Sequence, residues 1–384
     1  MAYFVSPQII FGEEALEELS KIEGKHALIV TDKFMVKFGY VKRVQELLQM
    51  ESTVFDEVEP DPSYETVMKG VEIISKIQSD IIIGLGGGSP MDVAKTIRIL
   101  YEKPDLAIED IAPMVEVEIK KTKLILIPTT SGTGAEVTTA IVLTRKDEER
   151  KAPTANFAAM ADIAIIDPSL AKNMPPALTA NTGMDALCHS IDGYISTLKN
   201  DFSDGLCIKA AEMIFEYLPR AYQNREDKEA REKMHIAASI AGLGFGNSQA
   251  GLSHGMGHSL GAVFHLPHGK ACGISLPYSL QYLDREPEVM TLLAKFAYHL
   301  GIQKETEEES VKELVEKIFD LMTAIDIPHF LKAEISPEDF KSKLEKLVEN
   351  AIFDGTIVFL RRTPDTEELK KLFEYAYEGK EIDF

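Results

Sequence analysis

The distribution of apolar positions changes character about halfway along the chain. Up to about Pro168, short runs rich in β-branched residues alternate with amphipathic stretches such as 64–78 and 91–102. Continuous apolar runs of this length are typical of strands that are buried on both faces of a parallel sheet. The runs that fit this description are 25–31, 80–85, 123–128 and 162–168. The first half of the chain is therefore predicted to be an α/β domain.

Beyond about Pro176 the strand pattern fades, and one amphipathic stretch follows another. The expected helices are 177–197, 204–218, 227–244, 287–301, 306–325, 336–350 and 366–378. A chain of 384 residues is long enough for about two domains, each with its own core. We therefore expect a Rossmann-like parallel-sheet domain at 1–176 and an all-helical domain at 177–384.

Histidine and aspartate side chains gather near the start of the helical half. Asp185 and His189 are one helical turn apart, so both can reach one cation from the same helix face. Downstream, His254, His258 and His268 belong to a stretch in which four of the nine histidines lie between positions 254 and 268. Imidazoles and a carboxylate suit Fe(II) or Zn(II). The predicted ligand set contains no thiolate, which argues against a structural zinc knot. A lone Asp-x-x-x-His is more often a surface pair or a buried polar pair.

A glycine-rich turn follows the strand that ends near Leu85. Gly86, Gly87 and Gly88 let the backbone approach a ligand, while Ser89 and Pro90 suit the N-cap and first position of the next helix. Such a helix N-terminus offers open amides to a pyrophosphate. The spacing is neither Gly-x-Gly-x-x-Gly nor a Walker loop, and a tight strand-to-helix turn is the alternative.

Two other segments fit the same ligand. Thr129 and Thr130 follow another strand and could line the crevice at the carboxyl edge of the sheet, or simply form a polar loop. Asp32 follows the first strand, where a carboxylate accepts ribose hydroxyls and repels a 2′-phosphate. That placement favours NAD over NADP, although a helix N-cap would explain Asp32 equally well.

The composition of the chain limits the kinds of molecule that it can bind. The balance of 41 Lys+Arg against 62 Asp+Glu gives a net charge of −21, which repels nucleic acids and anionic membranes. Three scattered cysteines without a Cys-x-x-Cys motif indicate a reduced compartment. The sequence has no signal-peptide pattern, and none of its apolar runs is long enough to cross a bilayer. We therefore expect a cytoplasmic enzyme that acts on a small molecule.

Four motifs, in this order and spacing, resemble the iron-containing (group III) alcohol dehydrogenases. They are Gly86-Gly-Gly-Ser-Pro-Met-Asp-Val-Ala-Lys95, Pro128-Thr-Thr-Ser-Gly-Thr-Gly-Ala-Glu-Val137, Gly183-Met-Asp-Ala-Leu-Cys-His189, and His254-Gly-Met-Gly-His-Ser-Leu-Gly261 through Pro267-His-Gly269. The resemblance covers nearly the whole chain and is strongest to lactaldehyde reductase, butanol dehydrogenase and propanediol dehydrogenase types. It implies the dehydroquinate synthase-like fold, with an NAD(P)-binding α/β domain and a helical metal domain.

The resemblance also implies roles for individual residues. Asp185, His189, His254 and His268 would be the metal ligands, and His258 would relay a proton beside them. The cofactor would be held by Gly86, Gly87, Gly88, Ser89, Thr129 and Thr130, with Asp32, Lys151 and Phe245 also on its side. The implied reaction is hydride transfer between nicotinamide and a small primary alcohol or aldehyde, in a homodimer or larger homo-oligomer.

Three departures from the family pattern affect substrate preference and tail packing rather than the ligands. Cys188 stands where threonine is common, Asp192 replaces a glutamate, and Arg361-Arg-Thr-Pro replaces the usual Asn-Pro-Arg. Two other function classes remain open at this point. A metal- and NAD-dependent lyase of the dehydroquinate synthase type would need Lys and Arg for an anionic substrate, and 245–269 contains none. A non-enzymatic NAD-binding sensor would have little use for four ligands.

Overall fold

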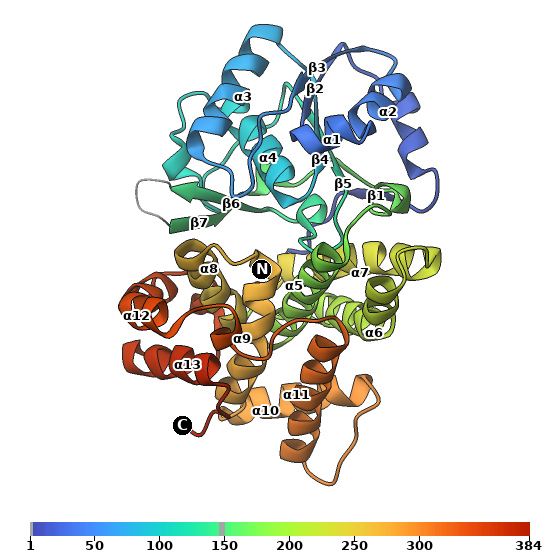
Figure 1. Cartoon of the computed structure of the whole chain (residues 1–384). Helices are drawn as coiled ribbons and strands as arrows, with labels where there is room; N and C mark the ends of the chain where they lie inside the picture. Colours follow the sequence, from blue (N-terminus) through green and yellow to red (C-terminus); the bar gives the residue numbers. More distant parts are fainter. Residues whose placement is uncertain (1–2, 146–149) are drawn as a thin grey trace. The chain divides into compact units, whose positions relative to one another are not determined.

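The computed structural model describes residues 3–145 and 150–384. The chain divides into two compact units, residues 1–173 and 174–384, and each is described by itself below. The first unit contains all the described strands, and the second is built from helices. Figure 1 labels the elements of both units. This architecture confirms the predicted fold class.

The first unit is built on a six-stranded sheet in which every described pairing is parallel. Its order is β1-β8-β5-β4-β2-β3, and the predicted apolar runs supply four of the strands. The central strands β4 and β5 pair from Ile81 with Lys123 to Gly86 with Pro128. The strands are β1 (Gln8–Phe11), β2 (His26–Val30), β3 (Glu51–Phe55), β4 (Ile81–Gly86), β5 (Lys123–Pro128) and β8 (Ile163–Ile166).

Helices cover both faces of this sheet, which is why its strands are apolar throughout. On one face, Leu28, Val30 and Ile82 pack with α3 (Tyr64–Ile77) and α4 (Gly88–Glu102). On the other face, alternate strand residues pack with η1 (Ala15–Lys21) and α2 (Tyr40–Leu47), and α1 (Lys33–Lys37) precedes α2. In Figure 1 the sheet lies between α3 and α4 on one side and α1 and α2 on the other.

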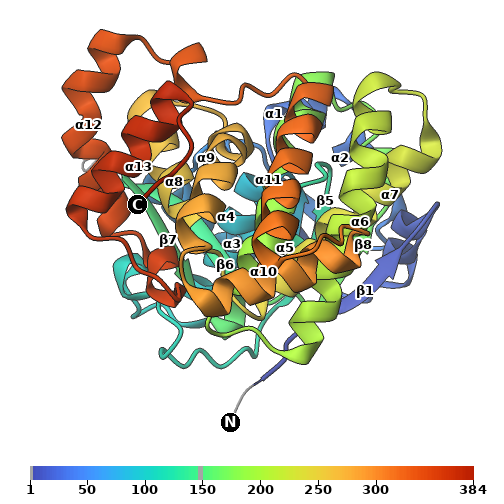
Figure 2. The same cartoon turned by 90° about the horizontal axis from the view of Figure 1, so that it is seen from below.

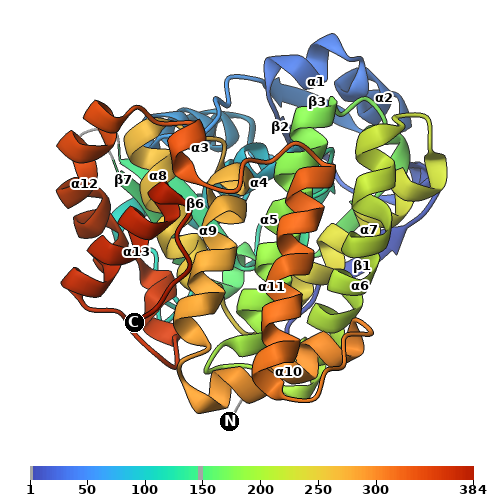
Figure 3. The same ribbon diagram turned by 60° about the horizontal axis from the view of Figure 1, so that its bottom comes forward.

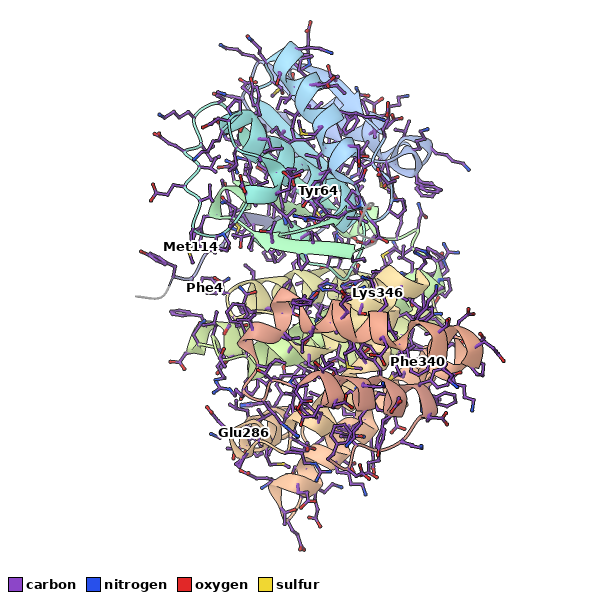
Figure 4. The ribbon with its side chains drawn as sticks, turned by 90° about the vertical axis from the view of Figure 1, so that its left-hand side faces the viewer. Phe4, Tyr64, Met114, Glu286, Phe340 and Lys346 are labelled. Atoms are coloured by element: carbon purple, nitrogen blue, oxygen red, sulfur yellow. The ribbon has the colours of Figure 1, made fainter. Side chains whose placement is uncertain are left out.

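An antiparallel hairpin, which the sequence did not predict, interrupts the α/β order. It consists of β6 (Ala140–Arg145) and β7 (Arg150–Ala155), with Ala140 opposite Ala155. Single 3₁₀ turns complete the unit: η2 (Ile108–Asp110), η3 (Ala135–Val137), η4 (Phe157–Ala159) and η5 (Pro168–Leu170). On the surface, the Met114 side chain projects into solvent with 94 % of its area exposed (Figure 4).

The second unit is a bundle of nine described helices with short connections. Side-chain caps explain several of its boundaries: Asn200, Thr306 and Asp365 each form a capping box at the start of a helix. The helices are α5 (Pro176–Ile195), α6 (Asp201–Gln223), α7 (Lys228–Gly246), α8 (Leu252–Phe264), α9 (His268–Leu283), α10 (Pro287–His299), α11 (Glu307–Ala324), α12 (Pro337–Ile352) and α13 (Thr366–Glu378). Two 3₁₀ turns, η6 (Leu331–Ala333) and η7 (Gly355–Phe359), connect the last of them.

Helix α5 is the central element of this bundle. It packs against α6, α7 and α9, and every residue from Gly183 to Ile195 is buried. Figures 2 and 3 show α8 next to α9, and α10 next to α11. A helix that is apolar around most of its circumference is expected at the centre of a core. A polar side chain on α5 is therefore held away from water.

The C-terminal helices close the unit on the side of α8. Helix α12 packs against both α8 and α13, and the Phe340 ring of α12 stacks on Tyr377 of α13 at a centroid distance of 4.0 Å. Figure 4 shows Phe340 in the second unit. The turn η7 also packs on α8, because Gly255 leaves room that a Cβ would lose by meeting Ile357 at 2.8 Å.

Candidate metal centre and cofactor loop

Helix α5 presents Asp185 and His189 on one face, as their spacing predicts. Both side chains are buried, with 3 % of Asp185 and 6 % of His189 exposed. The Nε2 atom of His189 lies 4.0 Å from Oδ1 of Asp185. A carboxylate and an imidazole in this position cannot be satisfied by bulk water, so they need a partner within the protein or a bound ion.

Two further imidazoles approach the same carboxylate oxygen. His254 of α8 places Nε2 3.8 Å from Asp185 Oδ1, and His268, the first residue of α9, places Nε2 3.3 Å from it. The sequence explains the close approach of α9 to α5. A Cβ on Gly269 would lie 2.0 Å from the carbonyl oxygen of Asn181 and 2.9 Å from Cβ of Asp185. Only glycine fits after His268, and this brings the histidine to the carboxylate.

The cluster has the geometry of a metal site. Ligand bonds of about 2.0–2.3 Å in a tetrahedral arrangement place ligand atoms about 3.3–3.8 Å apart. The three distances to Asp185 Oδ1 are 3.3, 3.8 and 4.0 Å. Asp185 Oδ1 and His254 Nε2 are buried and make no hydrogen bond to any described residue. The donor set therefore fits a divalent cation.

Electrostatics favour a cation at this position. Burial alone would raise the pKa of Asp185, but the imidazoles of His189, His268 and His254 outweigh it and hold that pKa well below 3.8. Burial likewise lowers the pKa of His254, yet the carboxylates of Asp185 and Asp192 raise it to about 9. Two buried carboxylates thus face one imidazole, and this excess of negative charge stabilises a positive ion.

Asp192 determines the orientation of His254. Its Oδ2 accepts hydrogen bonds from His254 Nδ1 at 2.9 Å, Ser253 Oγ at 2.6 Å and the Gly251 amide at 3.0 Å. A carboxylate only accepts, so Nδ1 carries a proton, and Nε2 is the ring nitrogen that faces Asp185 and binds a cation once it is deprotonated. Asp192, which is shorter than the glutamate of the family pattern, contacts the Gly251 amide directly. This close approach requires glycine, because a Cβ at position 251 would lie 3.0 Å from Asp192 Cγ.

Phe245 stabilises the position of a second imidazole. Its ring stacks on His189 with a centroid distance of 3.9 Å and an interplanar angle of 8°. His189 in turn stacks on His254 at 4.5 Å. The family resemblance implies a place for Phe245 on the cofactor side, and the structure places its ring against a predicted metal ligand.

One sulfur atom beside the cluster was missed by the sequence analysis. The thiol of Cys272 belongs to a group with Asp185, His254 and His268 whose ligand atoms all lie within 4.8 Å of one another. Cys272 is one turn after His268 on α9, and its Sγ lies 3.7 Å from Nδ1 and 3.8 Å from Nε2 of that ring. The ligand set predicted from the sequence contains no thiolate, and the structure places this thiol beside it. The i, i+4 spacing from His268 was the available signal.

His258 lies at the edge of the same cluster. Its ring stacks on His268 with a centroid distance of 5.1 Å and an angle of 17°. Its Nδ1 is 2.8 Å from Oδ2 of Asp354, a residue that the sequence analysis did not single out. No local pattern connects positions 258 and 354, because the contact exists only once η7 packs on α8.

The glycine turn in the first unit begins its helix earlier than predicted. Helix α4 starts at Gly88 with Gly87 as N-cap, so Ser89 and Pro90 lie within the first turn rather than at its boundary. Gly86 has φ of +149°, and a Cβ there would meet Pro90 at 2.7 Å, which explains the glycine. The first amides of any α-helix lack partners within it. Here the first amides of the helix belong to Gly88 and Ser89, whereas Pro90 has no amide hydrogen.

The two predicted cofactor segments lie side by side in this unit. The Thr129 amide donates to the carbonyl of Gly86 at 2.8 Å, and a Cβ on Gly87 would lie 3.4 Å from Oγ1 of Thr130. Strand β4 pairs with β2 on one side and β5 on the other, and α4 lies on the opposite sheet face from α2. The chain therefore leaves β2 toward one edge of the sheet and leaves β4 toward the other edge. Parallel sheets bind ligands at such a switch point, at the carboxyl ends of the strands.

Two other predicted cofactor residues have structural partners. Asp32 caps α1, because its Oδ1 accepts from the amides of Phe34 at 2.7 Å and Met35 at 3.1 Å. Lys151 forms an ion pair with Asp61 at 2.8 Å. The cap and the ion pair each explain one of these residues without a cofactor. The predicted loop residues and the predicted metal ligands thus form two groups, one in each unit, and Phe245 belongs to the second.

Comparison with known proteins decides the family. Residues 6–168 match the model of the iron-containing alcohol dehydrogenases, and residues 179–377 match that of the C-terminal part of the Fe-containing alcohol dehydrogenase family. The chain belongs to the iron-containing alcohol dehydrogenase family. The NADPH-dependent butanol dehydrogenase of Clostridium saccharobutylicum is 41 % identical to it, over all of both chains. The predicted resemblance is confirmed.

Solved structures support the same assignment for this iron-containing alcohol dehydrogenase. An iron-containing alcohol dehydrogenase from Thermococcus thioreducens matches with a TM-score of 0.90 and 30 % identity, over 99 % of this chain and 100 % of the other. A sulfoacetaldehyde reductase from Bifidobacterium kashiwanohense in complex with NAD+ matches with a TM-score of 0.86 and 29 % identity, over 98 % of each chain. The protein is an NAD(P)-linked alcohol dehydrogenase and aldehyde reductase. These matches favour that prediction over the lyase and sensor alternatives.

Proposed function

We propose that the protein transfers a hydride between a nicotinamide and a small primary alcohol or aldehyde at a divalent-metal site formed by Asp185, His189, His254 and His268. The observation that carries this proposal is the convergence of three imidazole nitrogens on one buried carboxylate oxygen at 3.3–4.0 Å. One carboxylate and three imidazoles suit Fe(II), and Zn(II) fits the same donors. The family name favours iron.

The residues around the site have different roles in the proposed reaction. A bound divalent cation supplies Lewis acidity, which stabilises negative charge on the substrate oxygen. Asp192 fixes His254, and Phe245 fixes His189 by stacking, so two of the donors are oriented before a cation arrives. His258, beside His268 but outside the four donors, exchanges the proton of the alcohol. Asp185, His189 and His254 are buried, which keeps bulk water away from these three donors.

We propose that the cofactor pyrophosphate binds the amides at the start of α4. Gly87, Gly88 and Ser89 provide the open amides, Gly86 makes the turn that precedes them, and Thr129 and Thr130 lie beside them. Asp32 at the carboxyl end of β2 would accept the ribose hydroxyls, which favours NAD over NADP. The relative from Clostridium saccharobutylicum is named as NADPH-dependent, so Asp32 is the position at which cofactor choice has to be tested. Lys151 would reach the cofactor only after leaving Asp61.

The substrate class is proposed from the relatives and from the site. A butanol dehydrogenase and 1-propanol dehydrogenases are among the relatives, and the stretch 245–269 has no Lys or Arg for an anionic substrate. None of the described helices is long and apolar enough to cross a membrane. The cytoplasmic location and the homodimeric or larger assembly stay predictions.

The decisive experiment is an NADH oxidation assay with butanal and propanal on metal-free protein, with and without added Fe(II) or Zn(II), and with NADPH in parallel. We expect reduction of the aldehydes only when a divalent metal is present. Full activity in a chelator-treated protein without metal would contradict the proposal. Activity toward neither aldehyde with either metal and either cofactor would reject the substrate class.

A further inference from the structure

The side chain of Asp354 is held in place by two donors. Its Oδ1 accepts from the amide of Thr356 at 2.9 Å and from the hydroxyl of Thr356 at 2.6 Å. It forms the N-cap of η7, and this turn is fixed on α8 because Gly255 has no side chain that would meet Ile357. Asp354 is 8 % exposed. Its position is therefore determined before any contact with His258 is considered.

The other oxygen of Asp354 faces His258. Oδ2 lies 2.8 Å from Nδ1 of the imidazole, which is 6 % exposed and belongs to α8. The two ring nitrogens of an imidazole point in different directions, so Nε2 is directed away from Asp354, and the ring stacks on His268. The carboxylate thus contacts one nitrogen of the ring and leaves the other for a different partner.

We propose that Asp354 is a positioning residue that holds the proton of His258 on Nδ1, so that Nε2 is the atom that accepts the proton of the alcohol. This inference rests on the proposed dehydrogenase function and adds a residue to it. In alcohol oxidation the O–H bond breaks and an N–H bond forms at Nε2, while the hydride passes to NAD+. The imidazolium then releases its proton to water. In aldehyde reduction the same proton returns from Nε2 to the alkoxide.

The tautomer follows from the hydrogen-bonding capacity of a carboxylate. An ionised carboxylate has no proton to donate, so the atom 2.8 Å from Oδ2 must be the donor. Burial raises the pKa of Asp354, but His258 and Thr356 lower it to below its usual value of 3.8. The carboxyl group therefore stays ionised near neutral pH. In the neutral imidazole, Nδ1 therefore carries the proton and Nε2 carries the lone pair.

An asparagine at this position reverses the tautomer with almost no change of shape. In Asp354→Asn the carbonyl oxygen must face Thr356, because the Thr356 amide can only donate. The amide nitrogen then faces His258 Nδ1 and donates to it. This forces the imidazole proton onto Nε2, which can no longer accept one. A carboxylate-to-amide change that keeps the geometry and places the histidine in the wrong tautomer is a known way to abolish proton transfer.

The first arm of the test is a double-mutant cycle on the metal-loaded enzyme. We expect Asp354→Asn to lower kcat for butanol oxidation by about 10²-fold, the lower end of what general acid–base catalysis contributes, with KM and bound metal near wild type. In a His258→Gln background the same change should have no further effect on kcat. A kcat for Asp354→Asn equal to wild type overturns the proposal, as does the same loss in both backgrounds. Asp365→Asn, which alters the cap of α13 in the same way, is the matched control.

The second arm reads the tautomer directly and does not depend on activity. Zn(II)-loaded protein labelled with ¹⁵N at histidine gives separate signals for protonated and unprotonated ring nitrogens, and His258→Gln assigns the signal. We expect the proton on Nδ1 in wild type and on Nε2 in Asp354→Asn. A wild-type proton on Nε2 overturns the proposal even if Asp354→Asn does not fold. Absence of aldehyde reduction by the wild type would reject the proposed function instead, and the ¹⁵N signals would still decide the tautomer.

Discussion

Replacing Asp192 by asparagine removes one charge beside the metal site and leaves the shape almost unchanged. The Oδ2 position must stay an oxygen, because it accepts from the Gly251 amide as well as from Ser253 and His254. The new amide nitrogen therefore takes the Oδ1 position, which is buried and makes no hydrogen bond to any described residue. All three accepted hydrogen bonds survive in Asp192→Asn. What changes is the strength of the bond to His254 Nδ1.

The magnitude follows from that bond. A hydrogen bond to a charged group contributes roughly 1.5–3 kcal/mol and a neutral one roughly 0.5–1.5 kcal/mol, so the change costs about 1–2 kcal/mol. At about 1.4 kcal/mol per tenfold, the affinity for the cation should fall about 5- to 30-fold. This agrees with the effect of about 10- to 100-fold that partners of metal-bound histidines usually have. The unpaired amide also lowers the stability of the fold by about 1–3 kcal/mol.

The assay is a competition between protein and a chelator for Zn(II), with thermal unfolding recorded on the same samples. Asp167→Asn is a suitable control, because Asp167 is also fully buried and accepts from the amides of Leu16 at 3.2 Å and Ser169 at 2.9 Å in the other unit. It should lose stability and keep its metal affinity. An Asp192→Asn protein whose Kd for Zn(II) stays within twofold of wild type would refute the role of this carboxylate.

Three other changes test separate parts of the account. Asp32→Gly should raise kcat/KM with NADPH relative to NADH at least about tenfold, because repulsion of the 2′-phosphate is lost; an unchanged ratio in steady-state kinetics removes Asp32 from cofactor choice. Burial raises the pKa of Asp284 to about 6, above its unfolded value, so the folded state binds the extra proton between about pH 4 and 6 and stability falls as the pH rises through that window. Asp284→Asn should therefore raise the free energy of unfolding at pH 7.5, by no more than about 3 kcal/mol, and change it little at pH 4. Denaturant titration at both pH values measures this, and a larger gain at pH 4 than at pH 7.5 would contradict it. Cys272→Ser should leave the visible spectrum of the Co(II)-loaded protein unchanged, because four better-placed donors complete the site, whereas loss of a thiolate-to-cobalt band would make Cys272 a ligand.

The fold was predictable where a local pattern determines the structure. The strands β2, β4, β5 and β8 are continuous apolar runs because helices cover both sheet faces, and this pattern is visible in the sequence. The hairpin of β6 and β7 was not predicted. Its residues are only partly apolar, and β7 includes a proline, which demotes a strand in any local analysis.

The helix boundaries show how tertiary contacts override local preference. Ser89 is a better N-cap than Gly87 by propensity, yet α4 begins at Gly88. Gly86, with φ of +149°, turns the chain directly after β4, and the helix starts as soon as that turn is complete. The difference matters for the cofactor loop, because it moves the first free amides of the helix toward the end of the strand.

Some residues of the site were predictable from local sequence patterns, and others were not. Asp185 with His189 is readable from i, i+4 spacing, and His254 and His268 from their density, since each motif is local. Asp354 and Cys272 were missed. Asp354 reaches His258 across 96 positions of sequence through packing of η7 on α8, and no local signal could show it. Gly269 and Gly251 are required by close approaches that exist only in the folded unit.

The most direct test of the central claim is the metal content of Asp185→Asn purified in parallel with wild type. Asp185 is the carboxylate on which all three imidazoles converge, so its neutral replacement leaves a dication without an anionic donor at the centre of the site. Elemental analysis should find about one divalent ion per chain in wild type and little in the variant. NADH binding, measured by fluorescence on the same samples, should survive because the proposed cofactor loop belongs to the other unit. A variant that keeps a full complement of metal would contradict the four-donor site.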